Sequence, residues 1–255
     1  MRLLSLSLMR DAIHSMGCDY DLRIPVWYKQ LAWVGIVYLI AVFAANFVFG
    51  MQLYFWFLLP IGGLLLLPSL LVAVVARFTR QARLRIRDRI VGAVTWRGDE
   101  QVLDVGTGSG ITLIGCAHQL TTGRATGIDI YDPNAGGGTP EIFWKNAQQE
   151  GVTDRVDLQN VNACQMPFPN DSFDVVVSTL AFHHIHSSSA AEGRREATRE
   201  ILRILRPGGT ILIYDAAHPL AEVESVLRAA GINNIQRSGH FFTLLQAKKV
   251  YSSVP

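Results

Sequence analysis

Hydrophobic and polar residues divide this chain into two parts with different patterns. Residues 30–76 contain no Asp, Glu, Lys, Arg or His. As one helix this segment would extend roughly 70 Å, about twice the thickness of the hydrocarbon core of a bilayer, so within a membrane it must turn back on itself. Residues 31–50 and 53–76 are each long enough to span, with residues 50–52 as the turn. The pattern predicts two transmembrane helices.

Two other interpretations of the uncharged segment stay open. One is a buried helical core. The other is a cleaved signal peptide, although 30 residues with three Asp precede the apolar run, where a signal peptide has a short basic leader. Within the second stretch, Pro60, Gly62, Gly63 and Pro68 allow either a kinked helix or a re-entrant segment that never crosses.

After Gly98 the pattern changes to short β-branched runs that alternate with helical stretches. Strands are predicted over residues 101–105, 125–130, 156–161, 173–179, 210–214, 232–237 and 241–247. Helices are predicted over residues 110–120, 140–150, 190–205 and 219–230. Strict alternation predicts an α/β fold, a Rossmann-like doubly wound, mostly parallel sheet with helices on both faces. The last two strands have room only for a turn between them, which predicts an antiparallel hairpin at the sheet edge.

Charge is concentrated next to the apolar segment. Residues 77–97 carry seven Arg and one Asp, a net charge of +6, whereas residues 1–30 sum to +1 and residues 98–255 to −5. Because Lys and Arg near span ends resist translocation, a hairpin with this flank places both termini in the cytoplasm. A local basic stripe suits an anionic leaflet, and nucleic acid is not an expected partner.

Apolar residues recur every fourth position through the basic stripe. They are Phe78, Ala82, Ile86, Ile90 and Val94. This spacing predicts a helix that lies on the lipid surface and leads into the next domain, with a solvated linker helix as the alternative. Residues 1–30 show a similar period before Gly17, so they form either a second interfacial helix or a disordered tail.

The cysteines predict neither a disulfide framework nor a metal site. Cys18, Cys116 and Cys164 are far apart and odd in number, without a CxxC spacing. A reducing compartment fits this usage.

The stretch "VLDVGTGSG", residues 102–110, follows the first predicted strand and opens the first helix, where doubly wound sheets bind ligands. The dinucleotide fingerprint G-x-G-x-x-G would place its third glycine at Ile111, whereas this chain has G-x-G-x-G. The carboxylate of Asp104 would repel a pyrophosphate but attract the ammonium and sulfonium of S-adenosylmethionine. Charge complementarity therefore favours S-adenosylmethionine as the cofactor.

A second acid supports the same cofactor. Asp129 ends the second predicted strand, 19 residues beyond Gly110, where a carboxylate accepts hydrogen bonds from ribose hydroxyls. Asp129 alone is also compatible with NAD. Both NAD and a glycine turn that binds no ligand stay open as alternatives.

With these residues in view, the chain resembles the class I S-adenosylmethionine-dependent methyltransferases, and among them the ubiquinone/menaquinone-biosynthesis group. The resemblance covers about residues 85–250 and leaves the hairpin outside. "VLDVGTGSG" looks like motif I of that family and "TGIDI" like the acidic end of its second strand. "NACQMPFPNDSFDVVVS" and "ILRILRPGGTILI" resemble its third-to-fourth strand segment and the helix and turn before its fifth strand.

The resemblance implies roles for particular residues. Besides Asp104, the implied cofactor-binding residues are Gly106, Thr107, Gly108 and Gly110 for the methionine part, Asp129 for the ribose, Ile130 for one adenine face, and Asn162 and Ala163 for the adenine edge. Many relatives have Asp at the position of Asn162, so somewhat weaker binding is expected there. No metal is implied.

Methyl transfer from a sulfonium needs mainly alignment, and a base only where the acceptor atom starts protonated. In "LAFHHI", His183 and His184 follow the fourth predicted strand, so either is a candidate base for a phenol or thiol, with packing as the alternative role. The Asn/Asp-Pro-Pro-aromatic motif of relatives that methylate amides and nucleobases is absent from this place, which argues against those substrates.

Together these observations predict a multi-pass membrane methyltransferase with its catalytic domain on the cytoplasmic side. The expected organisation is an N-terminal cytoplasmic segment (residues 1–30), a transmembrane hairpin (31–76), a basic juxtamembrane helix (77–97) and a methyltransferase domain (98–255). A domain held at the bilayer meets lipid-soluble molecules at high effective concentration, so the expected acceptor is a lipophilic small molecule. The alternative is a tethered module that binds S-adenosylmethionine or a partner without catalysis.

Overall fold

The computed structural model of the protein describes residues 27–50, 52–132 and 138–249. These residues fall into two compact units, which divide within one long helix between Ala82 and Arg83. The expectation of an interfacial helix in the N-terminal segment lies outside the described residues.

The first unit contains two apolar helices. They are α2 (Trp27–Phe49) and the longer α3 (Gln52–Gly92), which continues through Pro60 and Pro68 without a break. Both contain stretches long and apolar enough to cross a membrane, Lys29–Val48 and Trp56–Gly92. The prolines therefore do not divide the second stretch into shorter helices.

Small residues allow α2 and α3 to approach each other closely. A Cβ atom at Gly62 would overlap the side chain of Leu39, and one at Gly35 would lie 2.9 Å from Cδ2 of Leu66. The hydroxyl of Tyr38 also donates a hydrogen bond to the carbonyl of Leu58 at 3.2 Å. Such contacts are typical of helices that associate in lipid.

The second unit is built on a seven-stranded sheet with the order β3-β2-β1-β4-β5-β7-β6. The strands are β1 (Gln101–Val105), β2 (Arg124–Asp129), β3 (Val156–Asn160), β4 (Phe173–Thr179), β5 (Leu205–Ala216), β6 (Ile235–Gly239) and β7 (Phe242–Lys248). Strands β1 to β5 pair in parallel, whereas β7 is antiparallel to both β5 and β6. The predicted Rossmann-like sheet with an antiparallel edge hairpin is confirmed.

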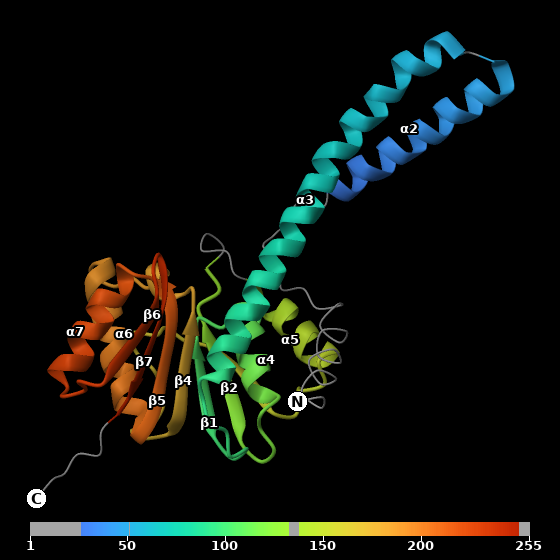
Figure 1. Ribbon diagram of the computed structural model, residues 1–255. Helices are drawn as coiled ribbons and strands as arrows, with labels where there is room; N and C mark the ends of the chain where they lie inside the picture. The colour runs from blue at the N-terminus through green and yellow to red at the C-terminus, as the bar shows by residue number, and fades with distance from the viewer. Residues whose placement is uncertain (1–26, 51, 133–137, 250–255) are drawn as a thin grey trace, which may run out of the picture. The chain divides into compact units, whose positions relative to one another are not determined.

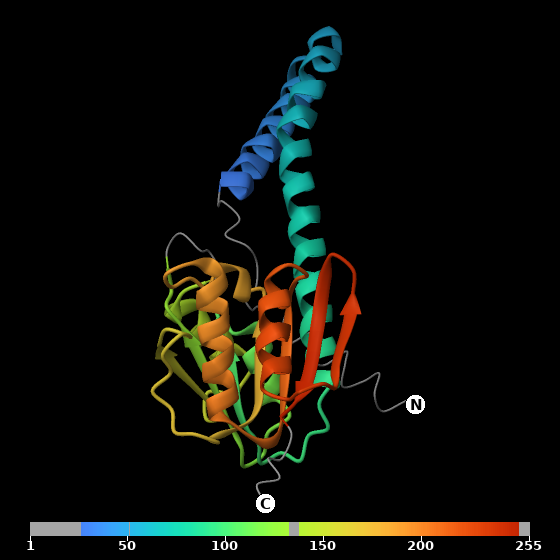
Figure 2. The same ribbon diagram turned by 90° about the vertical axis from the view of Figure 1, so that its left-hand side faces the viewer.

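Helices cover both faces of this sheet (Figures 1 and 2). They are α4 (Ile111–Ala117) and α5 (Pro140–Gln149) on one face, and α6 (Ala190–Ile204) and α7 (Pro219–Ala229) on the other. A short 3-10 helix, η2 (Phe182–His184), follows β4. Each face has its own hydrophobic core, with Phe182 in one and Phe143 in the other.

The C-terminal part of α3 belongs to the core of the sheet unit. Ile90 is fully buried beside β1 and α4, and Ile86 and Val94 pack against the same core. Arg89 also donates hydrogen bonds to the carbonyl and hydroxyl oxygens of Ser238 on β6. The apolar stripe was expected to face a lipid surface, but this half of it faces protein, because a sheet of this size needs a third helix on that face.

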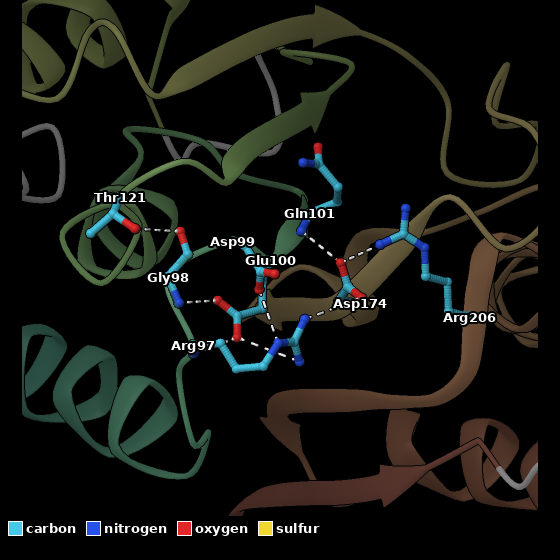
Figure 3. A network of polar contacts seen from close by, with 8 residues as sticks. All are labelled: Arg97, Gly98, Asp99, Glu100, Gln101, Thr121, Asp174 and Arg206. Atoms are coloured by element: carbon cyan, nitrogen blue, oxygen red, sulfur yellow. Dashed lines mark hydrogen bonds and ion pairs between the residues drawn. The ribbon is translucent and has the colours of Figure 1, made fainter.

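The amino edge of the sheet is held by a network of paired charges (Figure 3). The buried carboxylate of Glu100 accepts hydrogen bonds from the backbone N–H groups of Arg97 and Gly98, at 2.7 and 3.0 Å. Asp174 on β4 accepts from the backbone N–H of Gln101 and pairs with Arg206. These contacts fix the position at which β1 begins.

Candidate functional site

The carboxyl ends of β1, β2 and β4 meet where the strand order reverses, which is the usual ligand position in doubly wound sheets. The turn after β1 is tied to β2 there, because Gly106 and Thr107 donate backbone hydrogen bonds to the carbonyl of Ile128 at 2.8 and 3.1 Å. Gly106, Gly108 and Gly110 all have positive φ, at 74°, 52° and 86°. The turn therefore depends on glycine.

Gly106 also lies against the segment after β4. A Cβ atom at position 106 would overlap the Cβ of Ala181, two residues before His183. The glycine turn and the histidine pair are thus neighbours in space, although 77 positions separate Gly106 from His183 in the sequence.

Asp104 lies beneath the glycine turn and is almost completely buried. Its Oδ2 atom accepts a hydrogen bond from the Thr107 hydroxyl at 3.0 Å, while Oδ1 has no hydrogen-bond partner among the described residues. Burial raises the pKa of Asp104 to about 7, and the nearby charge of Asp129 contributes in the same direction. A cation bound nearby would stabilise the ionised form of Asp104.

Asp129 joins the end of β2 to the glycine turn. Its two carboxylate oxygens accept hydrogen bonds from the backbone N–H groups of Gly108 and Tyr131, at 2.9 and 2.7 Å. Each oxygen keeps capacity for another donor, as a ribose diol would require. The next side chain, Ile130, is 54% exposed and is available to a planar ring.

Tyr131 is a feature of this site that the sequence analysis missed. Its backbone has a positive φ of 50°, unusual for a residue other than glycine, and its hydroxyl donates to the carbonyl of Gly108 at 3.3 Å. Burial and the charge of Asp129 raise its pKa. Tyr131 therefore donates as a neutral phenol and connects the β2 loop with the glycine turn.

The end of β3 brings Asn162 and Ala163 toward the same edge. The backbone N–H of Val161 donates to the carbonyl of Asp129 at 3.3 Å, which joins the two loops. The side-chain oxygen of Asn162 accepts from the backbone N–H of Cys164 at 2.9 Å, and Ala163 packs against the core. The amide nitrogen of Asn162, rather than its oxygen, is thus the more available group for a ligand.

His183 is held by a buried acid from the neighbouring strand. Its Nδ1 atom lies 2.8 Å from Oδ1 of Asp215, the penultimate residue of β5, and Asp215 is fully buried. The backbone N–H groups of His183 and Ala216 also donate to the Asp215 carboxylate. Because an ionised carboxylate only accepts, this geometry places the ring proton on Nδ1 and leaves Nε2 as an acceptor.

His184 lies beside His183, with ring centroids 4.0 Å apart. Burial lowers the pKa of His184, and the adjacent His183 lowers it further. No carboxylate bonds to the His184 ring among the described contacts, so its orientation is fixed less firmly. Of the two predicted bases, His183 has the better defined geometry.

Among the described residues, no three side chains of His, Cys, Asp or Glu lie close enough together to hold a metal ion. Of the three cysteines, Cys116 is buried and Cys164 is half-buried, and both are free thiols.

Residues 103–213 match the family model described as a methyltransferase domain. The chain carries a methyltransferase domain. This confirms the predicted family of the domain, for which S-adenosylmethionine is the expected cofactor.

Curated relatives agree with this assignment. The chain is 31% identical over 135 residues to 27-O-demethylrifamycin SV methyltransferase of Amycolatopsis mediterranei. This alignment covers 53% of this chain and 45% of the relative. It is 29% identical over 132 residues to demethylmenaquinone methyltransferase of Symbiobacterium thermophilum, which covers 51% and 48%. The chain thus spans about half the length of the curated relatives it matches.

Solved structures show the same fold for the methyltransferase domain. The [4+2]-cyclase SpnF superposes with a TM-score of 0.54 at 20% identity, over 68% of this chain and 82% of the cyclase. A SAM-dependent methyltransferase from Aquifex aeolicus gives a TM-score of 0.51 at 19% identity, over 64% and 89%. At these identities the likeness concerns the fold alone.

Proposed function

We propose that this protein is a membrane-anchored methyltransferase that transfers a methyl group from S-adenosylmethionine to a lipophilic small molecule bearing an acidic hydroxyl or thiol. The observation that carries the proposal is the pairing of two features at one sheet edge. One is a glycine turn above a buried acid with a free oxygen, and the other is a histidine held by a buried aspartate.

The residues around the glycine turn fit a cationic donor. Asp104 Oδ1 is buried and accepts no hydrogen bond from any described residue, an arrangement that is unfavourable unless a donor or cation completes it. Asp129 faces the adjoining loop with unused acceptor capacity, and Ile130 presents an exposed apolar surface beside it. In this assignment Gly106, Thr107, Gly108 and Gly110 line the methionine part of the ligand, and Asn162 and Ala163 lie at the adenine edge.

When bound, S-adenosylmethionine supplies an electrophilic methyl group on a positively charged sulfur. His183 Nε2 would take the proton of the acceptor hydroxyl or thiol, so that the acceptor atom could receive the methyl group while the sulfur of the cofactor kept the electron pair of the carbon–sulfur bond. Asp215 stabilises the imidazolium that results and keeps the ring in the required tautomer. His183 is thus the base and Asp215 its positioning residue, while His184 shapes the pocket beside them.

The membrane anchor rests on α2 and α3. Only 11% of an apolar 18-residue window in each stretch is buried, whereas a core helix of a soluble protein is mostly buried. The Arg-rich flank favours a cytoplasmic domain. We place the anchor at residues 31–76, the basic segment at 77–97 and the methyltransferase domain after them, with the qualification that residues from Arg83 onward already pack with the domain.

The proposal is tested by supplying the full chain, in detergent, with methyl-labelled S-adenosylmethionine and a native lipid extract. Label is expected in an organic-soluble product with the wild-type chain and not with the His183→Ala variant. Label recovered only in water-soluble products would contradict a lipophilic acceptor. Cofactor binding without any transfer across the extract would favour the alternative of a binding module.

A further inference from the structure

The methyltransferase domain exposes few large hydrophobic side chains, and they gather at one edge. Among its described residues, those with substantial exposure are Ile130, Trp144, Phe241 and Phe242. Ile130 directly follows the carboxyl end of β2, and Trp144 lies in the second turn of α5, whose N-terminal end is at the same edge. Phe242 begins β7 and pairs with Ala216, the last residue of β5. All four therefore lie at or near the carboxyl edge, which also carries His183.

The two phenylalanines form the most prominent part of this surface. Phe241 is 79% exposed and Phe242 is 43% exposed, and their rings meet edge to face with centroids 5.3 Å apart. Phe242 also stacks against Tyr214, at 6.0 Å between centroids. The backbone is fixed as well, because Ala217 donates a hydrogen bond to the carbonyl of Phe241 at 3.1 Å. The exposed rings are thus held in place by the ends of β5 and β7.

The course of α3 through the domain indicates what this surface faces. Arg89 contacts Ser238, which pairs with Leu244 on β7, whereas Ala93 is contacted by Gln246, two residues further toward the amino edge. Within the sheet unit, the part of α3 that follows Ala82 therefore runs from the carboxyl edge toward the amino edge. Its first residue in this unit, Arg83, thus lies toward the edge that carries the phenylalanines. Arg85 and Arg89 are exposed along this part of α3 and supply positive charge.

The opposite edge has a different chemistry. Ion pairs occupy it, including Arg97 with Asp99, Arg206 with Asp174 and Lys249 with Asp171 (Figure 3 shows the first two). No large hydrophobic side chain is exposed there among the described residues of the domain. The large exposed apolar side chains of the domain therefore lie at or near the carboxyl edge alone, among the described residues. Exposed aromatic side chains beside basic residues are typical of the membrane interface.

We infer that the carboxyl edge of the sheet is a membrane-facing surface, on which Phe241 and Phe242 enter the interfacial layer of a bilayer that contains anionic phospholipid. The inference rests on the membrane anchor in the proposed function. It adds that the edge with His183 meets the bilayer itself, so that a lipid-soluble acceptor reaches the base without crossing water.

Spin labelling of the full chain in vesicles of phosphatidylcholine with one quarter phosphatidylglycerol tests this inference. A nitroxide is attached at Phe241→Cys in a background with Cys18→Ser and Cys164→Ser, while Cys116 is buried and stays unlabelled. Thr153→Cys is the matched control, because Thr153 is exposed in the turn before β3, at the amino edge. Collision rates with oxygen, which enters lipid, are compared with those of a water-soluble nickel chelate.

The ratio of oxygen to chelate collisions is expected to be several-fold higher at position 241 than at position 153. Equal ratios at the two positions would overturn the inference. Failure of the chain to float with the vesicles would overturn the anchor and the inference together. A high ratio at position 241 without any methyl transfer would leave the inference standing and contradict the proposed function, so the two failures are distinguishable.

A kinetic measurement examines the same surface by another route. The double variant Phe241→Ser with Phe242→Ser is expected to raise the KM for a vesicle-dissolved acceptor several-fold, while kcat and the Kd of S-adenosylmethionine stay unchanged. An unchanged KM would count against the inference, and Thr153→Ser serves as the control.

Discussion

Two buried acids at opposite ends of β1 have contrasting surroundings. Glu100, immediately before the strand, accepts two backbone hydrogen bonds, and its neighbours Arg97 and Asp99 form further ion pairs. Asp104, within the strand and close to its carboxyl end, is equally buried. It accepts one side-chain hydrogen bond, and its other oxygen has no hydrogen-bond partner in the part of the chain that the structure describes. An acid whose acceptors are satisfied by the chain stabilises the fold, whereas one with a free buried oxygen is available to a ligand.

The carboxyl edge, unlike the amino edge, is proposed to carry the chemistry, and the largest effect on activity is therefore expected at His183. His183→Ala is expected to reduce kcat by about 10²–10⁴-fold, because the proton acceptor is lost, while the Kd of S-adenosylmethionine changes little. Asp215→Asn should produce a loss of similar order, since an amide can donate to Nδ1 and shift the ring proton to Nε2. Single-turnover kinetics with calorimetric binding separates the two effects. A normal kcat in His183→Ala would remove His183 from the mechanism, and a normal kcat in Asp215→Asn would remove the positioning role of Asp215.

A stability effect is expected at the amino edge. Glu100→Ala leaves the backbone N–H groups of Arg97 and Gly98 without their buried acceptor, which should lower the free energy of unfolding by about 2–5 kcal/mol. Asp99→Ala is the matched control, because Asp99 is 62% exposed and its ion pair with Arg97 should contribute less than about 1 kcal/mol. Denaturant unfolding of the full chain in detergent measures both. Equal losses would mean that burial does not distinguish these acids.

At Asp104 the expected effect is smaller and depends on pH. The pKa of the Asp104 carboxyl group is about 7 in the folded chain and near 4 in the unfolded chain. Folding therefore favours the protonated form of Asp104, and the unliganded protein should become less stable as pH rises from about 4 to 7. Affinity for a cationic ligand should change in the opposite direction and increase over the upper part of that range. Asp104→Asn should remove this residue's contribution to both trends. Melting temperatures and Kd values of wild type and variant at pH 5, 6, 7 and 8 measure this contribution. Identical pH profiles in the two proteins would contradict the assigned role of Asp104.

Much of the fold follows from local sequence patterns. The predicted limits of β1 and β4 agree with the structure. Strand β2 is shifted by one residue at both ends and β3 is one residue shorter than predicted. The agreement is close because alternating β-branched runs and glycine turns are local signals. The cofactor turn was also accessible, since the spacing of Gly106, Gly108 and Gly110 and the charge of Asp104 lie within one short stretch.

Features that depend on long-range packing were not accessible in this way. Asp215 lies 32 residues beyond His183, and only the pairing of β4 with β5 brings the two together. An acid near the end of the strand after a histidine pair was a signal that the sequence analysis did not use. The role of Ile90 was hidden for another reason. An apolar stripe among arginines has the same spacing whether it faces lipid or a sheet, so periodicity alone does not separate the two.

The proposed site depends on the binding of a cationic methyl donor by the glycine turn and Asp104. Isothermal titration of the full chain in detergent at pH 8, with S-adenosylmethionine in one experiment and NAD in another, tests it most directly. We expect saturable binding of S-adenosylmethionine that Asp104→Asn weakens by about tenfold or more, with no binding of NAD. Binding of NAD in preference to S-adenosylmethionine, or binding of neither, would contradict it.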